Sequence, residues 1–354
     1  GNRGVDFSGS LSLLYKSNFC LRTALRILAP LRSFHAKNEQ ELYRAIGKID
    51  WGEIMDNRKT FAIDTAVFSE VFRNSHFVAL KCKDAIVDQF RERTGLRPSV
   101  DLDKPDIRIN IHCSRDRFLV SLDSSGAPLF KRGYRTQNHT APLNEVLAAG
   151  MILSTGWKGE VPFIDPMCGS GTLAIEAALI AANIPPGVFR EGFAFEQWKD
   201  FDVELFKRVL ENLPEEKEIK VPIEARDIDQ SSVEMTRKHV RNAGVGKYIK
   251  VSKKDFMETA AQDAPCMVVI NPPYGERIKT EEVAALYGGI GSVLKHAFGG
   301  SEAWIFSASQ EGLKNIGLKP DKRMTLYNGA LECKFQKYTL FRGSLRDFKQ
   351  QSSE

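Results

Sequence analysis

The segment with the clearest chemical meaning is Asn271-Pro-Pro-Tyr274, which follows the apolar run 268–270. An amino group on an aromatic base is a poor nucleophile, because its lone pair is delocalised into the ring. If the Asn271 side-chain oxygen and the Pro272 carbonyl accept its hydrogens, the nitrogen becomes tetrahedral and its lone pair can attack a methyl group. The two prolines have fixed φ angles and hold these acceptors rigidly, and Tyr274 offers a ring for stacking on the base. The segment predicts methylation of an exocyclic amino group, with the catalytic residues Asn271, Pro272, Pro273 and Tyr274.

A second segment, Asp165-Pro-Met-Cys-Gly-Ser-Gly-Thr172, predicts a cofactor site. Its glycines allow a ligand to approach the backbone closely. Ala174 follows them, so the third glycine of a dinucleotide fingerprint is absent. A carboxylate at this turn would repel a pyrophosphate but suits the ammonium and hydroxyl groups of S-adenosylmethionine. The predicted contacts to this cofactor are Asp165, Pro166, Met167, Cys168, Gly169, Gly171 and Thr172.

Two further carboxylates follow the next predicted strands. Asp227 stands where a ribose is gripped in nucleotide-binding sheets, whereas Asp229 is better explained as a helix cap. Asp255 is expected to accept a hydrogen bond from the adenine amino group, with Phe256 beside the ring. Asn271 also follows a predicted strand, so it is counted among the predicted cofactor contacts as well.

The elements around these segments alternate between strands and helices, which predicts a doubly wound α/β domain. Its functional residues fall at the carboxyl ends of strands, where such sheets bind ligands. The expected strands are 161–164, 222–225, 248–252, 267–270 and 303–306, with a closing hairpin at 324–326 and 334–340, and the expected helices are 172–182, 231–243 and 283–298.

The first half predicts a compact α+β module. Strands are expected at 4–7, 31–34, 61–68, 107–111 and 118–122, with helical spacing over 11–28, after Asn38 and around 82–90. A basic connector at 129–140 precedes a helix expected to open at Pro142.

Charge is distributed unevenly along the chain. The net charge is +5, and residues 1–160 hold 24 Lys and Arg against 18 Asp and Glu, so the whole positive excess lies in the first half. This gives weak support for a polyanion-binding module. The candidate phosphate contacts are Arg22, Arg26, Arg91, Arg93, Arg97, Lys131, Arg132 and Arg135. Arg277, beside the catalytic segment, is equally well explained as an RNA contact or as one partner of a surface ion pair.

Bulk features predict a cytoplasmic location. No apolar run reaches the length of a membrane helix, and the six cysteines are scattered without a Cys-x-x-Cys pair. Reduced thiols are therefore expected, with no metal site and no membrane partner.

Taken together, segments 165–172 and 271–277 resemble those of bacterial 23S ribosomal RNA guanine-N2-methyltransferases that carry a THUMP domain. Segments 83–88, 97–101 and 105–108 are similar to the THUMP portion, and 132–135 and 141–149 to the link into the catalytic domain. The likeness is greatest to the N-terminal half of a bifunctional member that also makes 7-methylguanine. The chain stops at Glu354, so that second activity is not expected here. Asn144 stands where the family pattern leads us to expect Lys, which puts one contact near the cofactor in doubt.

The resemblance implies a partial ferredoxin-like segment at 1–35, from which an upstream strand and helix are missing. It further implies a THUMP RNA-binding domain at 36–126, and a linker with a class I, Rossmann-like methyltransferase domain at 127–354. The implied cofactor is S-adenosylmethionine, the partner is large-subunit ribosomal RNA or its precursor, and the product is N2-methylguanosine. Methylation of a tRNA guanine, a DNA adenine or a protein glutamine remains an alternative. A nicotinamide-dependent dehydrogenase and a non-enzymatic RNA-binding protein fit the segments less well.

Overall fold

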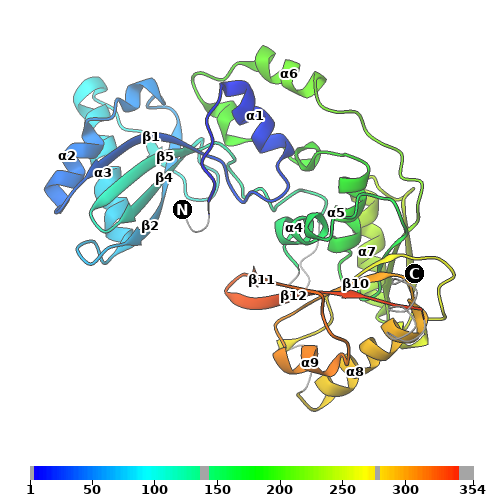
Figure 1. The fold of residues 1–354 in the computed structure, drawn as a ribbon. Coiled ribbons are helices and arrows are strands. Elements are labelled where there is room, and N and C mark those ends of the chain that lie inside the picture. Colours follow the sequence, from blue (N-terminus) through cyan, green and yellow to red (C-terminus); the bar gives the residue numbers. More distant parts are fainter. Residues whose placement is uncertain (1–3, 136–142, 276–279, 343–354) are drawn as a thin grey trace. The chain divides into compact units, whose positions relative to one another are not determined.

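The computed structural model describes residues 4–135, 143–275 and 280–342, which form two compact units (Figure 1). The first unit comprises residues 1–129 and 190–213, and the second comprises residues 130–189 and 214–354. The sequence placed one boundary between residues 126 and 127. It did not predict that residues 190–213 return to the first unit.

The first unit is built on a five-stranded sheet in the order β1-β5-β4-β2-β3. The alternation of Ile107, Ile109 and Ile111 with polar residues places those isoleucines in the core, as expected for a half-solvated strand. β2 pairs in parallel with β3 and β4, whereas β5 is antiparallel to β4 and β1. The strands are β1 (Leu28–His35), β2 (Thr60–Phe68), β3 (Ser99–Val100), β4 (Ile107–Ser114) and β5 (Arg117–Asp123).

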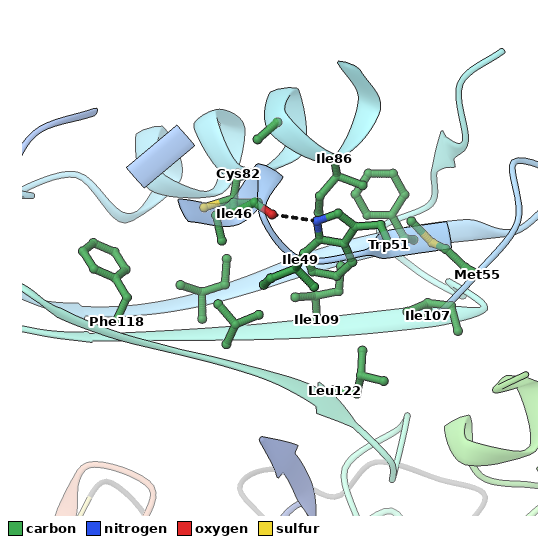
Figure 2. Close-up of a cluster of buried hydrophobic side chains, with 14 of the residues drawn as sticks. Ile46, Ile49, Trp51, Met55, Cys82, Ile86, Ile107, Ile109, Phe118 and Leu122 are labelled. Atoms are coloured by element: carbon green, nitrogen blue, oxygen red, sulfur yellow. Dashed lines mark hydrogen bonds between the residues drawn. The ribbon is translucent and has the colours of Figure 1, made fainter. Parts of the chain in front are cut away.

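Helices α2 (Glu39–Gly47) and α3 (Ser75–Thr94) pack against each other beside this sheet. The predicted cap Asn38 accepts a hydrogen bond from the Glu41 N–H, and α3 ends as predicted at Gly95, whose φ is +72°. Trp51, in the 3-10 turn Trp51–Glu53, is fully buried in the core between helices and sheet, and its indole N–H donates to the Ile46 carbonyl at 3.0 Å (Figure 2).

Residues 190–213 join the first unit through aromatic packing against α1 (Leu11–Cys20). Phe195 is fully buried and stacks on Tyr15 with ring centroids 4.6 Å apart. The segment contains a 3-10 turn at Ala194–Gln197 and the helix α6 (Val203–Glu211), which contacts α1.

Two expectations for the N-terminal residues were wrong. Residues 4–7 form no strand, because they pair with no neighbouring strand, and Val5 stays 89% exposed. The helix expected over 11–28 ends at Cys20, and Leu28 already belongs to β1.

The second unit is a seven-stranded sheet in the order β11-β12-β10-β9-β6-β7-β8. Neighbouring strands from β10 to β8 run parallel, and the β11–β12 hairpin adds the antiparallel edge that the sequence predicted. The strands are β6 (Phe163–Asp165), β7 (Ile223–Asp227), β8 (Ile249–Lys253), β9 (Met267–Ile270), β10 (Glu302–Ser307), β11 (Lys322–Asn328) and β12 (Leu331–Thr339).

Helices cover both faces of this sheet, which explains the apolar character of β9. Val269 packs into the core cluster shared with α5, whereas Val268 and Ile270 pack into the cluster shared with α8. In Figure 1, α4, α5 and α7 lie on one side of β10 and β12, with α8 and α9 on the other. The helices are α4 (Glu145–Thr155), α5 (Thr172–Ala181), α7 (Gln230–Asn242), α8 (Thr280–Ala297) and α9 (Gln310–Asn315), with 3-10 turns at Pro186–Phe189 and Phe256–Glu258.

The start of α4 differs from the prediction. Pro142 lies outside the described residues, and the helix begins at Glu145. Asn144 caps it, because its side-chain oxygen accepts hydrogen bonds from the N–H groups of Val146 and Leu147. In the described ranges, no helix is both long and apolar enough to cross a membrane.

Candidate active site

The glycine turn between β6 and α5 has the conformation that only glycine adopts easily. Gly169 and Gly171 have φ angles of +53° and +78°. A side chain at Gly171 would place its Cβ 2.7 Å from a methyl carbon of Thr236, whereas the space beside Gly169 is open for 4 Å. Gly171 is therefore needed for packing against α7, and Gly169 leaves a surface that a ligand can approach.

Asp165, the last residue of β6, is a fully buried carboxylate. The backbone N–H groups of Met167 and Ala174 lie near it, but within the described chain no group forms a hydrogen bond of good geometry with either oxygen. Burial, with a smaller contribution from the negative charge of Asp227, raises the pKa of Asp165 well above its usual range. Such a group is costly without a ligand, which marks it as a place where a cationic or hydrogen-bonding partner binds.

Asp227 ends β7 and is tied to the glycine turn. One carboxylate oxygen accepts the Gly169 N–H at 2.8 Å, and the other accepts the Asp229 N–H at 2.9 Å. Asp229 caps α7 by accepting the Ser232 N–H, which confirms its structural interpretation.

Asp255 and Phe256 follow β8, the strand next to β7. The Asp255 carboxylate caps a 3-10 turn by accepting the Met257 N–H at 2.9 Å. Phe256 is 3% exposed and stacks on Phe298 of the core, so its ring has little surface left for an adenine.

Asn271 follows β9 on the other side of β6. Its side-chain oxygen is buried and accepts no hydrogen bond from the described residues. β6 is the strand at which the chain order reverses, since β7 and β9 are its two neighbours. Asp165 and Asn271 thus flank the topological switch point, which is the usual ligand crevice of an open α/β sheet.

Tyr274 is more buried than the sequence suggested. The residue is 6% exposed, and its ring meets Phe306 edge to face, at 6.2 Å between centroids. Only a small part of the ring is available to a base in this conformation. The Pro273 carbonyl lies 3.4 Å from the hydroxyl of Tyr287, which is itself 2.6 Å from the Ser307 hydroxyl.

This arrangement has clear counterparts among known proteins. Residues 132–337 match a family model described as the RMKL-like methyltransferase domain. The chain belongs to this methyltransferase family. Residues 36–123 match the THUMP domain, and residues 1–28 match the RlmL ferredoxin-like domain.

Individual relatives agree with the family. A protein of Synechocystis sp. named as an RNA methyltransferase is 40% identical over 341 residues, which are 96% of this chain and 89% of the relative. Ribosomal RNA large subunit methyltransferase K/L of Syntrophotalea carbinolica is 38% identical in an alignment of 351 positions that covers 95% of this chain. The chain spans about half the length of such K/L relatives, 49% in that case. A methyltransferase crystallised with S-adenosylhomocysteine has a TM-score of 0.83 and 31% identity, covering 95% of this chain and 89% of the other.

The methyltransferase uses S-adenosylmethionine as its cofactor, and the crevice fits this molecule. The Asp165 carboxyl, the open side of Gly169 and the Asp227 carboxylate offer acidic and hydrogen-bonding groups to the ammonium and hydroxyls of this molecule. Among the residues in view, no His, Cys, Asp and Glu cluster is suited to a metal ion, and all six cysteines are free thiols.

The predicted phosphate contacts are in very different environments. Arg132 is 1% exposed and faces Glu176, which Tyr134 also contacts at 3.1 Å, so this arginine is not available to RNA. Arg135 is mostly buried and pairs with Glu145 at 3.1 Å. Both corrections have one physical reason: the segment that looks like a basic connector packs against α4 and α5.

The other cations are more accessible. Arg97 and Lys131 are exposed, whereas Arg22 is half-buried. Arg91 and Arg93 lie in the last turn of α3, where cations favour the helix dipole, and Arg26 pairs with Asp123. Arg91 and Arg93 also pair, with Asp88 and Asp50, and Arg277 lies outside the described residues.

Sequence reasoning missed the residues that support the glycine turn from α7. The Thr236 hydroxyl donates to the Gly169 carbonyl at 2.8 Å, and a ring nitrogen of the fully buried His239 lies 3.0 Å from the Ser170 carbonyl. Burial lowers the pKa of His239, which favours the neutral form of the ring. Their spacing of three residues along one helix face was the available signal.

Proposed function

We propose that this protein transfers a methyl group from S-adenosylmethionine to the exocyclic N2 of a guanosine in 23S ribosomal RNA. The observation that carries the proposal is the buried side-chain oxygen of Asn271 at the switch point of the sheet, which has no hydrogen-bond partner among the described residues. A buried acceptor without a partner is costly, and the amino group of a base supplies the donor that it lacks.

The catalytic work of the protein is to orient the amino group. Asn271 and the Pro272 carbonyl accept its two hydrogens, and the prolines keep both acceptors in place. Pro273 continues the rigid turn into Tyr274, which bounds the base site. The bound cofactor supplies an electrophilic methyl group. Most of the acceleration comes from holding the two reactants in line, and no strong base is required because the methylated nitrogen loses its proton readily.

The cofactor roles follow the strand order. Asp165 and the turn 166–172 hold the methionine end, Asp227 binds the ribose through the remaining lone pairs of its carboxylate, and Asp255 lies where the adenine amino group is expected. Gly169 provides the open backbone surface. Because Phe256 is buried, its proposed role is to support the residues around Asp255 from the core rather than to contact the adenine.

Large-subunit ribosomal RNA is the proposed substrate because the K/L relatives bear that name and match nearly the whole chain. The THUMP match at residues 36–123 supports an RNA rather than a DNA or protein substrate. The exposed Arg97 and Lys131, with Arg91 and Arg93, are the proposed contacts to its phosphates.

The test is to incubate the protein with methyl-labelled S-adenosylmethionine and unmodified large-subunit ribosomal RNA, with tRNA and DNA in parallel, and to identify the labelled nucleoside. N2-methylguanosine from ribosomal RNA alone is the expected result. N2-methylguanosine from tRNA alone would support the proposed reaction but contradict the proposed substrate. N6-methyladenine in DNA would contradict both the reaction and the substrate.

Asn271→Ala and Asn271→Asp form a matched pair for the mechanism. The alanine variant loses the acceptor, and its rate should fall by roughly 100-fold or more, as when one preorganised polar group is removed from an active site. The aspartate variant keeps an acceptor oxygen and should retain more of the rate. Equal rates in the two variants would remove the assigned role of Asn271.

A further inference from the structure

We propose that Asn328, the last residue of β11, is a positioning residue that fixes Tyr274, so that the β11–β12 hairpin is part of the machinery that places the target base. This inference rests on the proposed function, because it concerns the same base site.

The hairpin extends beyond the edge of the sheet at which the site lies. β10 runs parallel to β9, and its last residue, Ser307, pairs with Lys334 of β12. The three residues of β12 before Lys334, beginning at Leu331, therefore project past the carboxyl end of β10, by about 10 Å at roughly 3.4 Å per residue. Figure 1 shows β11 and β12 continuing past β10.

A tight turn fixes the position of Asn328 within this projection. Asn328 pairs with Leu331, so only Gly329 and Ala330 form the loop. Gly329 has a φ of +64°, as two-residue hairpin loops require at their first position. The backbone on both sides of Asn328 is thus held by the ladder and by the turn.

The side chain of Asn328 reaches the catalytic segment. Its amide nitrogen donates to the Tyr274 hydroxyl at 3.2 Å, across 54 residues of sequence. Cys333 of β12 is also close to that hydroxyl: burial raises the pKa of its thiol, and a hydrogen bond with Tyr274 partly offsets the rise. The hairpin therefore touches Tyr274 from both of its strands.

Contacts at both ends of the Tyr274 side chain hold its ring in place. Phe306 of β10 packs against the ring edge to face, and Asn328 holds the hydroxyl at the far end. A tyrosine side chain has two rotatable angles before its hydroxyl, so one contact to the ring and one to its tip fix both. Without Asn328, the ring keeps its packing against Phe306, but its hydroxyl loses the hydrogen bond from β11. Because Tyr274 follows Asn271 by three residues, movement of the ring alters the space in which the amino group must meet its acceptors.

A double-mutant cycle tests this inference. The variants are Asn328→Ala, Tyr274→Phe and the combination, and the measurement is the single-turnover rate of methyl transfer at saturating cofactor, on whichever RNA the unchanged protein labels. We expect Asn328→Ala to slow transfer about tenfold, since it removes one hydrogen bond. The double variant should be no slower than Tyr274→Phe alone, because Asn328 acts through the hydroxyl that this variant lacks.

Asn328→Asp and Asn328→Leu are the conservative and disruptive controls. The aspartate accepts a hydrogen bond from the Tyr274 hydroxyl, which restores the contact with donor and acceptor exchanged, and should recover most of the rate. The leucine should not. Affinity for S-adenosylhomocysteine should stay within about twofold in every variant that is folded, because Asn328 touches no cofactor residue.

Three outcomes would overturn the inference. The first is that Asn328→Ala slows transfer equally in the Tyr274→Phe background and in the unchanged protein. The others are an unchanged rate in Asn328→Ala, and equal rates in Asn328→Asp and Asn328→Leu. These outcomes are distinct from failure of the proposed function. That failure is seen in the unchanged protein alone, as label in the wrong nucleoside or the wrong nucleic acid.

Discussion

The backbone N–H of Gly169 donates to a carboxylate oxygen of Asp227 at 2.8 Å, which joins the turn after β6 to the end of β7. Two segments that are 58 residues apart in the sequence are thereby held as one surface. The same carboxylate accepts the Asp229 N–H, so its orientation is set by the fold before any ligand binds. If the cofactor binds here, as proposed, it meets a surface whose shape is already fixed.

Asp165→Asn should stabilise the free protein while weakening cofactor binding. The pKa of Asp165 is raised in the folded state, so the folded chain holds a proton that the unfolded chain releases above pH 3.8. Stability is therefore lost as the pH rises from that value toward the folded-state pKa. Asparagine does not ionise, so the Asp165→Asn variant does not lose stability in this way. Its melting temperature should exceed that of the unchanged protein by about 2 °C or more at neutral pH.

The check is a melting curve for both proteins between pH 4.5 and 8, with and without S-adenosylhomocysteine. The advantage of the variant should shrink toward acidic pH. Its affinity for the ligand should fall by roughly tenfold or more, because an amide, unlike the carboxyl, cannot lose a proton to pair with the ligand's ammonium group. A variant that is less stable than the unchanged protein at every pH would contradict this account of Asp165.

Gly169→Ala and Gly171→Ala should fail in different ways. Both place a side chain at positive φ, at a cost of about 1–2 kcal/mol. Gly171→Ala also brings its Cβ within 2.7 Å of Thr236, which adds an overpacking cost of about 1–3 kcal/mol. Gly169→Ala should fold with modest loss but bind S-adenosylhomocysteine poorly, because its methyl group enters the open space beside the turn.

Thr236→Ser provides the matched control for the second variant. It removes the methyl group that clashes while keeping the hydroxyl that donates to Gly169, so it should restore part of the stability lost in Gly171→Ala. The measurement is the free energy of unfolding by denaturant for the unchanged protein, Gly171→Ala, Thr236→Ser and the double variant. If the stability losses of the two single variants simply add in the double variant, the clash with Thr236 is not the cause of the loss in Gly171→Ala.

Arg132→Ala should destabilise the second unit rather than weaken RNA binding directly. It leaves the fully buried Glu176 without its cation, and breaking a buried pair in this way costs about 3–5 kcal/mol. Replacing both partners, as in Arg132→Met with Glu176→Leu, should recover much of the loss. Lys131→Ala, one residue earlier and exposed, is the control and should change stability by less than about 0.5 kcal/mol.

Arg97→Ala should weaken RNA binding without changing stability. If Arg97 contacts one phosphate, the slope of log affinity against log salt should fall by about one. Arg58→Ala removes an exposed charge from the same unit that already pairs with Asp56, and should change the slope less. An equal slope for Arg97→Ala and the unchanged protein would place the RNA elsewhere.

Phe195→Ala should unfold the first unit selectively. The side chain lies within residues 190–213, yet it is buried against Tyr15 and stacks on Phe193 at 5.3 Å. Its removal should cost about 3–5 kcal/mol. In a calorimetric scan, the transition that S-adenosylhomocysteine does not stabilise should move down, and the ligand should still bind. Loss of ligand binding instead would tie this segment to the second unit.

Much of the site was determined by the sequence itself, because its signals are local. Gly171 adopts the positive φ that its position in the turn implies, Asn38 and Asp229 cap the helices they precede, and the apolar residues 268–270 form a strand buried on both faces. These features depend on backbone angles and on neighbours within a few residues, so residue type and spacing are sufficient to predict them.

The tertiary structure decided what depends on distant partners. Residues 4–7 alternate like a strand but have no strand to pair with, and Arg132 looks like a surface cation but is buried opposite Glu176. The return of residues 190–213 to the first unit, and the contact of Asn328 with Tyr274, join segments whose separation in sequence carries no local signal. Burial, charge pairing and long-range hydrogen bonds are properties of the packed chain, because each one requires a partner that only the fold brings near.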